Sequence, residues 1–306
     1  MAILVNKDTR VLIQGITGSE GARACREMLS YGTQVLAGVT PGKGGQSVEN
    51  VSVYNSVREA LSQHSAINAS LVVVPARFCL AAATEAINAG IPLVNILTEH
   101  VPTQDSARLL ALARAHNVKL VGPSSVGIIS PGQGKLGAIG SSTTSKVFTP
   151  GPIGVISKSG GMTAELALAL SKAGLGQSTA IGMGGDQIVG MDFSDLLLLF
   201  AGDKDTTAVV MFGEVGGTYE EQAALMIKKG GFTKPMVAMI AGRFTESLPE
   251  GAVLGHAGAI VSRGRGGYYS KVRALSDAGV KIARTLEEIP EILKTQIYYE
   301  IQNKTN

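Results

Sequence analysis

The sequence predicts an α/β protein built from two tandem domains, each with a mostly parallel sheet covered by helices. Three observations lead to this prediction. Short apolar segments alternate with amphipathic segments, clusters of glycine follow the apolar segments, and the alternation breaks once near the middle and then restarts. At 306 residues the chain is long enough for two domains of ordinary size.

The first half of the chain alternates between predicted strands and predicted helices. Apolar, β-branched segments predict strands at residues 10–16, 34–40, 69–76, 91–99 and 118–125. Segments with helical spacing predict helices at residues 18–32, 77–90 and 103–117. Strands interleaved with helices in this way favour a parallel sheet that is buried on both faces. We therefore expect a first domain over residues 1–125.

Residues 126–150 interrupt this alternation. They are rich in Gly, Ser, Thr and Pro, and they read as a linker with room for one hairpin. Strands are again expected at residues 153–160, 178–185, 207–217 and 234–242, with helices at 162–174, 193–202 and 219–230. The segment 268–297 adds a helix, a short strand and a last helix. A second domain is therefore expected over residues 151–306.

Composition narrows the class of protein. The net charge is only +3, no run of Lys or Arg occurs, and aromatic residues make up 5% of the chain, so we expect no nucleic-acid partner. The apolar segment 195–202 is far too short to span a membrane, and no signal peptide opens the chain. Cys25 and Cys79 lack metal-ligand spacing and lie in predicted helices, so they are expected to be buried thiols, with no metal site. These features favour a cytoplasmic protein.

Glycines and one lysine follow the first two predicted strands. In open parallel sheets, ligands bind outside the carboxyl ends of strands. The segment "GITGSEG" differs from the G-x-G-x-x-G pattern of dinucleotide-binding proteins, which argues against a nicotinamide cofactor, although its amides suit a pyrophosphate. Lys43, in "VTPGKGG", follows the second strand and favours a phosphate on an adenosine group. A plain turn and a solvated lysine are the alternatives.

A second set of polar residues belongs to the second half. The segment "SKSGGM" opens a predicted helix. It could offer hydroxyl groups and amides to an anion, or it could act as a plain N-cap. The candidate anion-binding residues are Ser157, Ser159, Gly160 and Gly161. Glu214 ends a predicted strand. His256, in "LGHAGAI", is surrounded by small residues that leave room for a bulky group on its ring. An imidazole can act as a nucleophile, and a carboxylate can fix its tautomer.

Several motifs together resemble one known family. "VTPGKGG", "LTEHVPTQD", "SKSGGMTAE", "MFGEVGG", "TKPMVAMIAG" and "GHAGAI" occur in the order found in alpha subunits of succinate–CoA ligase (succinyl-CoA synthetase). The resemblance covers nearly the whole chain. It implies a Rossmann-like CoA-binding domain followed by a flavodoxin-like α/β ligase domain. It also implies an acid–thiol ligase of the tricarboxylic acid cycle that makes succinyl-CoA reversibly from succinate, CoA and ATP or GTP.

The resemblance also assigns residues and a partner. His256 would carry the phosphoryl group, with Glu214 as its acidic partner. The CoA contacts would be Thr17, Gly18, Ser19, Glu20, Lys43, Leu97, Thr98 and Glu99. An ATP-grasp beta subunit would hold the nucleotide and Mg²⁺, in a heterodimer or heterotetramer, which accounts for the missing Walker A pattern in this chain.

The chain departs from the family at the residues expected around the acid. It has "GPSS" at residues 122–125 where the family has "GPNC", and Ala164 stands where the family has a tyrosine. The "SGGM" form is more similar to citryl-CoA-forming relatives, and loss of a tyrosine would leave space for a larger acid. A citryl-CoA or malyl-CoA ligase is therefore the alternative function. A CoA-binding regulatory protein without catalysis is less favoured, because His256 and Glu214 are both present.

Overall fold

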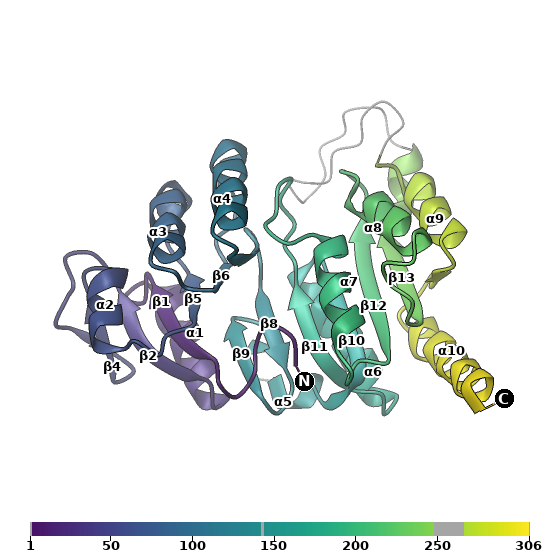
Figure 1. Cartoon of the computed structure of the whole chain (residues 1–306), viewed down its shortest axis with the longest axis horizontal. Coiled ribbons are helices and arrows are strands. Elements are labelled where there is room, and N and C mark those ends of the chain that lie inside the picture. Colours follow the sequence, from purple (N-terminus) through teal and green to yellow (C-terminus); the bar gives the residue numbers. More distant parts are fainter. Residues whose placement is uncertain (1, 142–143, 248–265, 306) are drawn as a thin grey trace.

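The computed structural model describes residues 2–141, 144–247 and 266–305. Within these residues the chain forms two seven-stranded sheets, each with helices on both faces (Figure 1). The α/β fold class predicted from the sequence is confirmed. No helix among the described residues is long and apolar enough to cross a membrane.

The first sheet has the strand order β3-β4-β2-β1-β5-β6-β7. Its parallel strands are β1 (Arg10–Gln14), β2 (Gln34–Val39), β4 (Val51–Tyr54), β5 (Ala69–Val72), β6 (Leu93–Ile96) and β7 (Lys119–Val121), with β3 (Ser47–Val48) antiparallel at the edge. Counting parallel strands alone, the order is 3-2-1-4-5-6, which is the Rossmann arrangement. Its topological switch point lies between β1 and β5.

The helices of the first domain divide between the two faces of this sheet. They are α1 (Ser19–Ser30), α2 (Val57–Gln63), α3 (Ala76–Asn88) and α4 (Thr103–Ala115). Leu12 of β1 packs in one apolar cluster with residues of α2, α3 and α4. Its neighbours Val11 and Ile13 point to the other face, where they join α1 and side chains of the second domain. Both cysteines are buried, as predicted.

The second sheet has the order β14-β13-β12-β10-β11-β8-β9. Its parallel strands are β10 (Pro150–Ser157), β11 (Gln177–Gly182), β12 (Ala208–Glu214), β13 (Met236–Ala241) and β14 (Lys281–Ile282). In chain order these strands read 2-1-3-4-5 across the sheet, which is the flavodoxin-like arrangement, with its switch point between β10 and β12.

The helices of the second domain also cover both faces. They are α5 (Thr144–Val147), α6 (Gly160–Lys172), α7 (Phe193–Gly202), α8 (Tyr219–Lys228), α9 (Tyr268–Asp277) and α10 (Glu288–Thr305), with a 3₁₀ helix at Arg243–Ser247. One apolar cluster joins the sheet to α6 and α10, and another joins it to α7, α8 and α9. Each predicted helix of this half is present.

The segment expected as a linker takes part in the second sheet. It contains the hairpin β8 (Gly127–Ser130) and β9 (Gly134–Gly137), and β8 pairs antiparallel with β11. This hairpin also contacts the first domain: Lys135 lies 3.6 Å from Glu27 of α1, and its backbone N–H and C=O both bond the Thr33 hydroxyl. The hairpin therefore connects the two domains.

Residues 47–63 fold into elements that the sequence did not predict, namely β3, β4 and α2. These elements are two to seven residues long, too short for a periodic pattern to be read. The helix is set by its cap, because the Ser56 hydroxyl accepts a hydrogen bond from the Glu59 amide and the Glu59 carboxylate accepts one from the Asn55 amide.

Candidate functional site

A cavity of about 550 Å³ lies at the switch point of the first sheet. Its walls are the ends of β1, β2 and β5 and one face of α3, and the lining residues are Gln14, Gly15, Thr17, Gly18, Val39, Thr40, Pro41, Val73, Val74, Pro75, Phe78, Ala81, Ala82 and Glu85. Most of these side chains are apolar or small. A cavity of this size, apolar with a few polar groups, suits a cofactor-sized ligand.

Glycine is required where β1 turns into α1. Gly15 has a φ of +87°, and a Cβ atom there would lie 2.2 Å from the carbonyl oxygen of Val73. A Cβ atom at Gly21 would lie 2.2 Å from the carbonyl oxygen of Gly15. The start of α1 is thus packed directly against the turn, and its N-cap, Gly18, has no side chain to bond the free amides of the first turn. These amides lie at the end of the helix that borders the cavity, because Gly18 also lines the cavity wall. An anion is favoured at such a helix N-terminus.

The residues expected to contact the coenzyme lie around this cavity to different extents. Thr17 and Gly18 line its wall, and the Thr17 hydroxyl donates to the Thr40 hydroxyl at 3.1 Å. Ser19 and Glu20 are exposed in the first turn of α1, where Glu20 pairs with Arg23.

The other expected contacts follow β2 and β6. Lys43 is exposed in a turn that Asn55 holds, because the Asn55 amide oxygen accepts from the Gly42 and Gly44 amides at 3.0 Å each. Leu97, Thr98 and Glu99 follow β6, and the Thr98 hydroxyl donates to the carbonyl of the cavity residue Val74 at 2.7 Å.

Helix α3 also lines the cavity, which the sequence had not indicated. Its lining residues recur at helical spacing, and they are Phe78, Ala81, Ala82 and Glu85.

The switch point of the second sheet holds the polar turn "SKSGG". The Ser157 hydroxyl donates to the carbonyl of Ser159 at 2.8 Å and accepts from the Ser159 amide at 3.1 Å, so Ser157 shapes the turn. Ser159 is the N-cap of α6 and accepts from the Met162 amide. A Cβ atom at Gly161 would meet no atom of residues 2–141, 144–247 or 266–305 within 4 Å, so these residues leave space at the start of this helix. The first turn of α6 can therefore receive an anion.

Glu214 ends β12, the strand beside β10, and it is 8% exposed. Its backbone amide donates to the Glu220 carboxylate at 3.1 Å. Because Ser157 of β10 is in register with Phe212, the turn that leads into α6 and the end of β12 emerge from adjacent strands. His256 lies outside the described residues.

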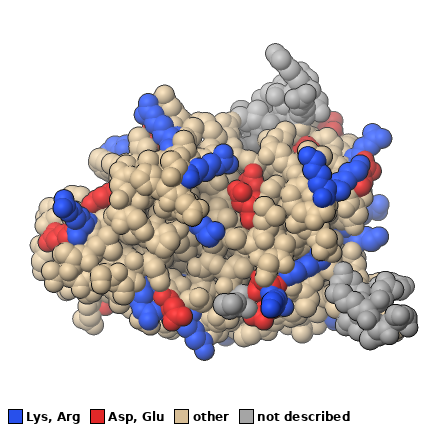
Figure 2. All heavy atoms as spheres, viewed as in Figure 1, with Lys and Arg blue, Asp and Glu red and all other residues tan. Residues whose placement is uncertain are grey.

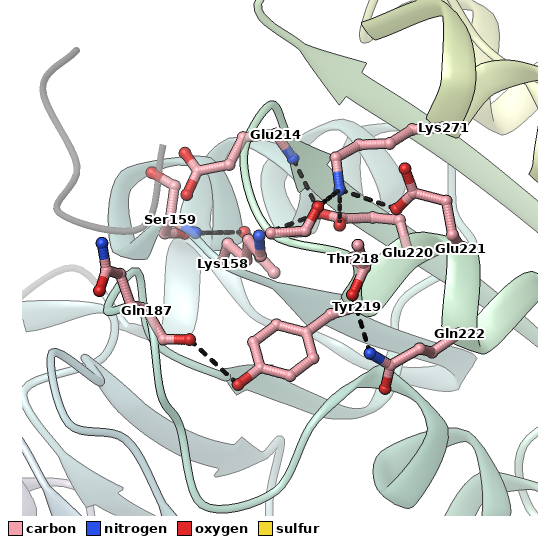
Figure 3. Close-up of polar contacts among 12 residues, drawn as sticks. Lys158, Ser159, Gln187, Glu214, Thr218, Tyr219, Glu220, Glu221, Gln222 and Lys271 are labelled. Carbon is pink, nitrogen blue, oxygen red and sulfur yellow. Dashed lines mark hydrogen bonds and ion pairs between the residues drawn. The ribbon is translucent and has the colours of Figure 1, made fainter. Parts of the chain in front are cut away.

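A buried ionic cluster underlies this second site (Figure 3), and no motif in the sequence indicated it. Lys158 lies 3.2 Å from Glu220, Lys271 pairs with the other oxygen of Glu220, and Lys271 also lies 3.0 Å from Glu221. Burial by itself raises the pKa of Glu220, but the ammonium groups of Lys158 and Lys271 outweigh that effect and hold it below its usual range. Glu220 is therefore a carboxylate at neutral pH.

The departures around residues 122–125 have a structural role. The Ser125 hydroxyl is buried and donates to the Asn95 side chain or to the carbonyl of Gly182, at 2.9 Å and 2.6 Å. Since Asn95 belongs to the first sheet and Gly182 to the second, Ser125 lies where the two domains meet. Ala164 is half-buried on α6, where it packs against an apolar cluster.

Comparison with known proteins agrees with this division into two units. The family model described as a CoA binding domain matches residues 6–100, and the model described as CoA-ligase matches residues 156–288. The chain therefore has the two-unit organisation of a CoA ligase chain.

Curated relatives narrow the family further. The chain is 44% identical to subunit alpha 2 of the ADP-forming succinate–CoA ligase of Archaeoglobus fulgidus, over 96% of this chain and 99% of that one. It is 45% identical to the corresponding alpha subunit of Aquifex aeolicus, over 100% and 99%. The chain belongs to the family of succinate–CoA ligase alpha subunits, and the resemblance noted in its motifs is confirmed.

Solved structures share the fold at lower identity. The ATP citrate lyase of Methanosaeta concilii, solved in complex with (3S)-citryl-CoA, superimposes with a TM-score of 0.90 at 23% identity. The match covers 99% of this chain and 52% of that one, so this chain spans about half the length of the lyase. At this identity the similarity concerns the fold.

Proposed function

We propose that this chain is the alpha subunit of an ADP-forming succinate–CoA ligase, which joins succinate to CoA through a phosphohistidine and an acyl phosphate. The observation that carries the proposal is the identity of about 44% to such subunits over nearly the full length of both chains. Two features of the structure support it: a ligand-sized cavity at the first switch point, and a helix start capped by Ser159 beside the end of Glu214's strand at the second.

The first domain would bind CoA. The free amides at the start of α1, with Thr17, Gly18, Ser19 and Glu20 around them, suit the pyrophosphate. The exposed Lys43 can reach a phosphate on the adenosine group, and the face of α3 in the cavity offers apolar contact. The segment Leu97, Thr98 and Glu99 would complete the site at the end of β6.

The second domain would carry the phosphoryl group. A neutral nitrogen of His256 attacks the terminal phosphorus of the nucleoside triphosphate, and the diphosphate leaves. A carboxylate oxygen of succinate then attacks the phosphorus, the bond from phosphorus to His256 breaks, and the imidazole leaves, which gives an acyl phosphate. The CoA thiol loses its proton and attacks the acyl carbon, and inorganic phosphate leaves. Glu214 would orient the imidazole, and the first turn of α6 from Ser159 to Gly161 would hold the phosphoryl oxygens. An ATP-grasp beta subunit would supply the nucleotide site and Mg²⁺.

A substrate panel tests this proposal. The chain is purified with its partner subunit and given CoA, Mg²⁺, and ATP or GTP with succinate, citrate or malate, and acyl-CoA is identified by mass. Succinyl-CoA is the expected product, whereas citryl-CoA or malyl-CoA alone would mean that the acid site takes a different acid.

The phosphoryl step is tested separately with His256→Asn. This variant should lose phosphate labelling from the triphosphate while binding CoA as the wild type does. Labelling that persists in the variant would place the phosphoryl group on another residue.

A further inference from the structure

Glu220 is the centre of the buried cluster in the second domain. Its side chain has no exposed surface, and each of its two carboxylate oxygens has its own partners. Oε1 lies 3.2 Å from the Lys158 ammonium and accepts from the Glu214 amide at 3.1 Å, whereas Oε2 pairs with Lys271. Figure 3 shows Lys158 and Lys271 reaching this carboxylate from different elements. One side chain thus joins the ends of β10 and β12 to helix α9.

The two Oε1 partners belong to the candidate phosphoryl site. Lys158 directly precedes Ser159, the N-cap of α6, and the other partner is the backbone of Glu214 itself. The Lys158 side chain is 3% exposed and also lies 5.7 Å from the centre of the Tyr219 ring, so its position is well defined. Moving the Glu220 carboxylate would therefore move the start of α6 and the end of β12 together.

Close packing supports the same relation. A Cβ atom at Gly213 would lie 2.7 Å from Cγ of Glu220, so this side chain is placed directly against the backbone of β12. Only glycine at residue 213 permits this approach. This contact does not depend on the ion pairs. It places the Glu220 side chain against Gly213, the residue that precedes Glu214 in β12.

Glu221 provides an internal comparison. It is the next residue on α8 and also pairs with Lys271, at 3.0 Å, and it accepts from the Ser270 hydroxyl at 2.8 Å. Within the part of the chain that the structure describes, its polar contacts lead to α9 and not to Lys158 or Glu214. If Glu220, like Glu221, only fastened α8 to α9 through Lys271, the two glutamates would be equivalent in function.

We propose that Glu220 is a positioning residue for phosphoryl transfer, which sets the geometry of Glu214 and of the α6 N-terminus through Oε1. This inference rests on the proposed function, because it concerns the site that would hold the phosphohistidine. A neutral amide at residue 220 would still fit the space, but it would not balance the ammonium group of Lys158. The turn beside Ser159 would then relax.

The test compares Glu220→Gln with Glu221→Gln in the complex of this chain with its partner subunit. Acyl-CoA formation gives kcat and the KM for CoA, and thermal unfolding is followed in parallel. We expect Glu220→Gln to lower kcat at least about tenfold with the KM for CoA changed less than twofold, and Glu221→Gln to change both less than threefold. Equal loss of kcat in both variants, or wild-type kcat in Glu220→Gln, would overturn the inference.

A second pair covers failure of Glu220→Gln to fold. Lys158→Gln and Lys271→Gln each leave Glu220 with one ammonium partner, on opposite oxygens. We expect Lys158→Gln to lower kcat. We expect Lys271→Gln to lower the unfolding temperature with kcat near that of the wild type. Loss of kcat in Lys271→Gln, with kcat near that of the wild type in Lys158→Gln, would refute the role of Oε1. A wild-type complex that forms no acyl-CoA would count against the proposed function. Failure of the proposed function is thereby distinguished from failure of the inference about Glu220.

Discussion

Replacing Gly21 by alanine tests how tightly helix α1 must pack against the coenzyme cavity. The added Cβ atom would lie 2.2 Å from the carbonyl oxygen of Gly15 and 2.9 Å from the Cα atom of Ile16, whereas ordinary contact begins at 3.4 Å. Both neighbours are backbone atoms, so no side chain can rotate away. The helix start must shift relative to the turn that lines the cavity.

The expected cost follows from two opposing effects. Overpacking against a rigid neighbour costs up to about 3 kcal/mol, and the backbone contact places Gly21→Ala at that end. Alanine favours a helix over glycine by about 1 kcal/mol, which leaves a net loss of about 2 kcal/mol. Because Gly15, Thr17 and Gly18 line the cavity, the same shift should raise the Kd for CoA at least about tenfold, or about 1.4 kcal/mol.

Urea unfolding and calorimetric titration with CoA measure these two quantities on the full chain. Gly202→Ala is the matched control, because a Cβ atom there meets no described residue within 4 Å and the residue also lies in a helix. The control should leave CoA binding unchanged and the unfolding midpoint unchanged or higher. An unfolding midpoint and a Kd like those of the wild type in Gly21→Ala would refute the packing argument.

Three further outcomes are expected. Lys43→Ala should weaken binding of CoA about two- to tenfold but leave binding of dephospho-CoA unchanged, as measured by titration, because an exposed lysine–phosphate contact is modest. Glu27→Gln should destabilise the protein by about 3 kcal/mol by leaving Lys135 buried without its carboxylate, and Lys135→Met in the same chain should restore the unfolding midpoint. Burial raises the pKa of the Cys25 thiol to about 11 from 9.0. The stability that the neutral, buried thiol contributes is therefore present below pH 9 and is lost as the pH rises through 11. In Cys25→Ala, the free energy of unfolding should change less with pH over this range.

The charged surface is consistent with a protein that binds small anions at defined sites. On the face drawn in Figure 2, lysine and arginine side chains are interspersed with aspartate and glutamate. Selectivity for an anionic coenzyme then depends on local groups, such as helix N-termini and Lys43, more than on a broad positive field.

The sequence by itself determined the two α/β domains, the long strands and helices, and Ser159 at the start of α6, because periodicity and caps are local properties of the chain. It also placed Thr17 and Gly18 at the end of β1 and Glu214 at the end of β12. Only the tertiary structure decided which strand ends are neighbours, since sheet order depends on long-range pairing.

The structure likewise decided which side chains share the two sites. The α3 face of the cavity, the attachment of the β8–β9 hairpin to the second sheet, and the cluster around Glu220 join residues far apart in the chain. Glu220 and Lys271 are 51 residues apart, and each reads as an ordinary helical surface charge in the sequence. Their burial follows from the packing of α8 and α9 on the sheet, which no local pattern records.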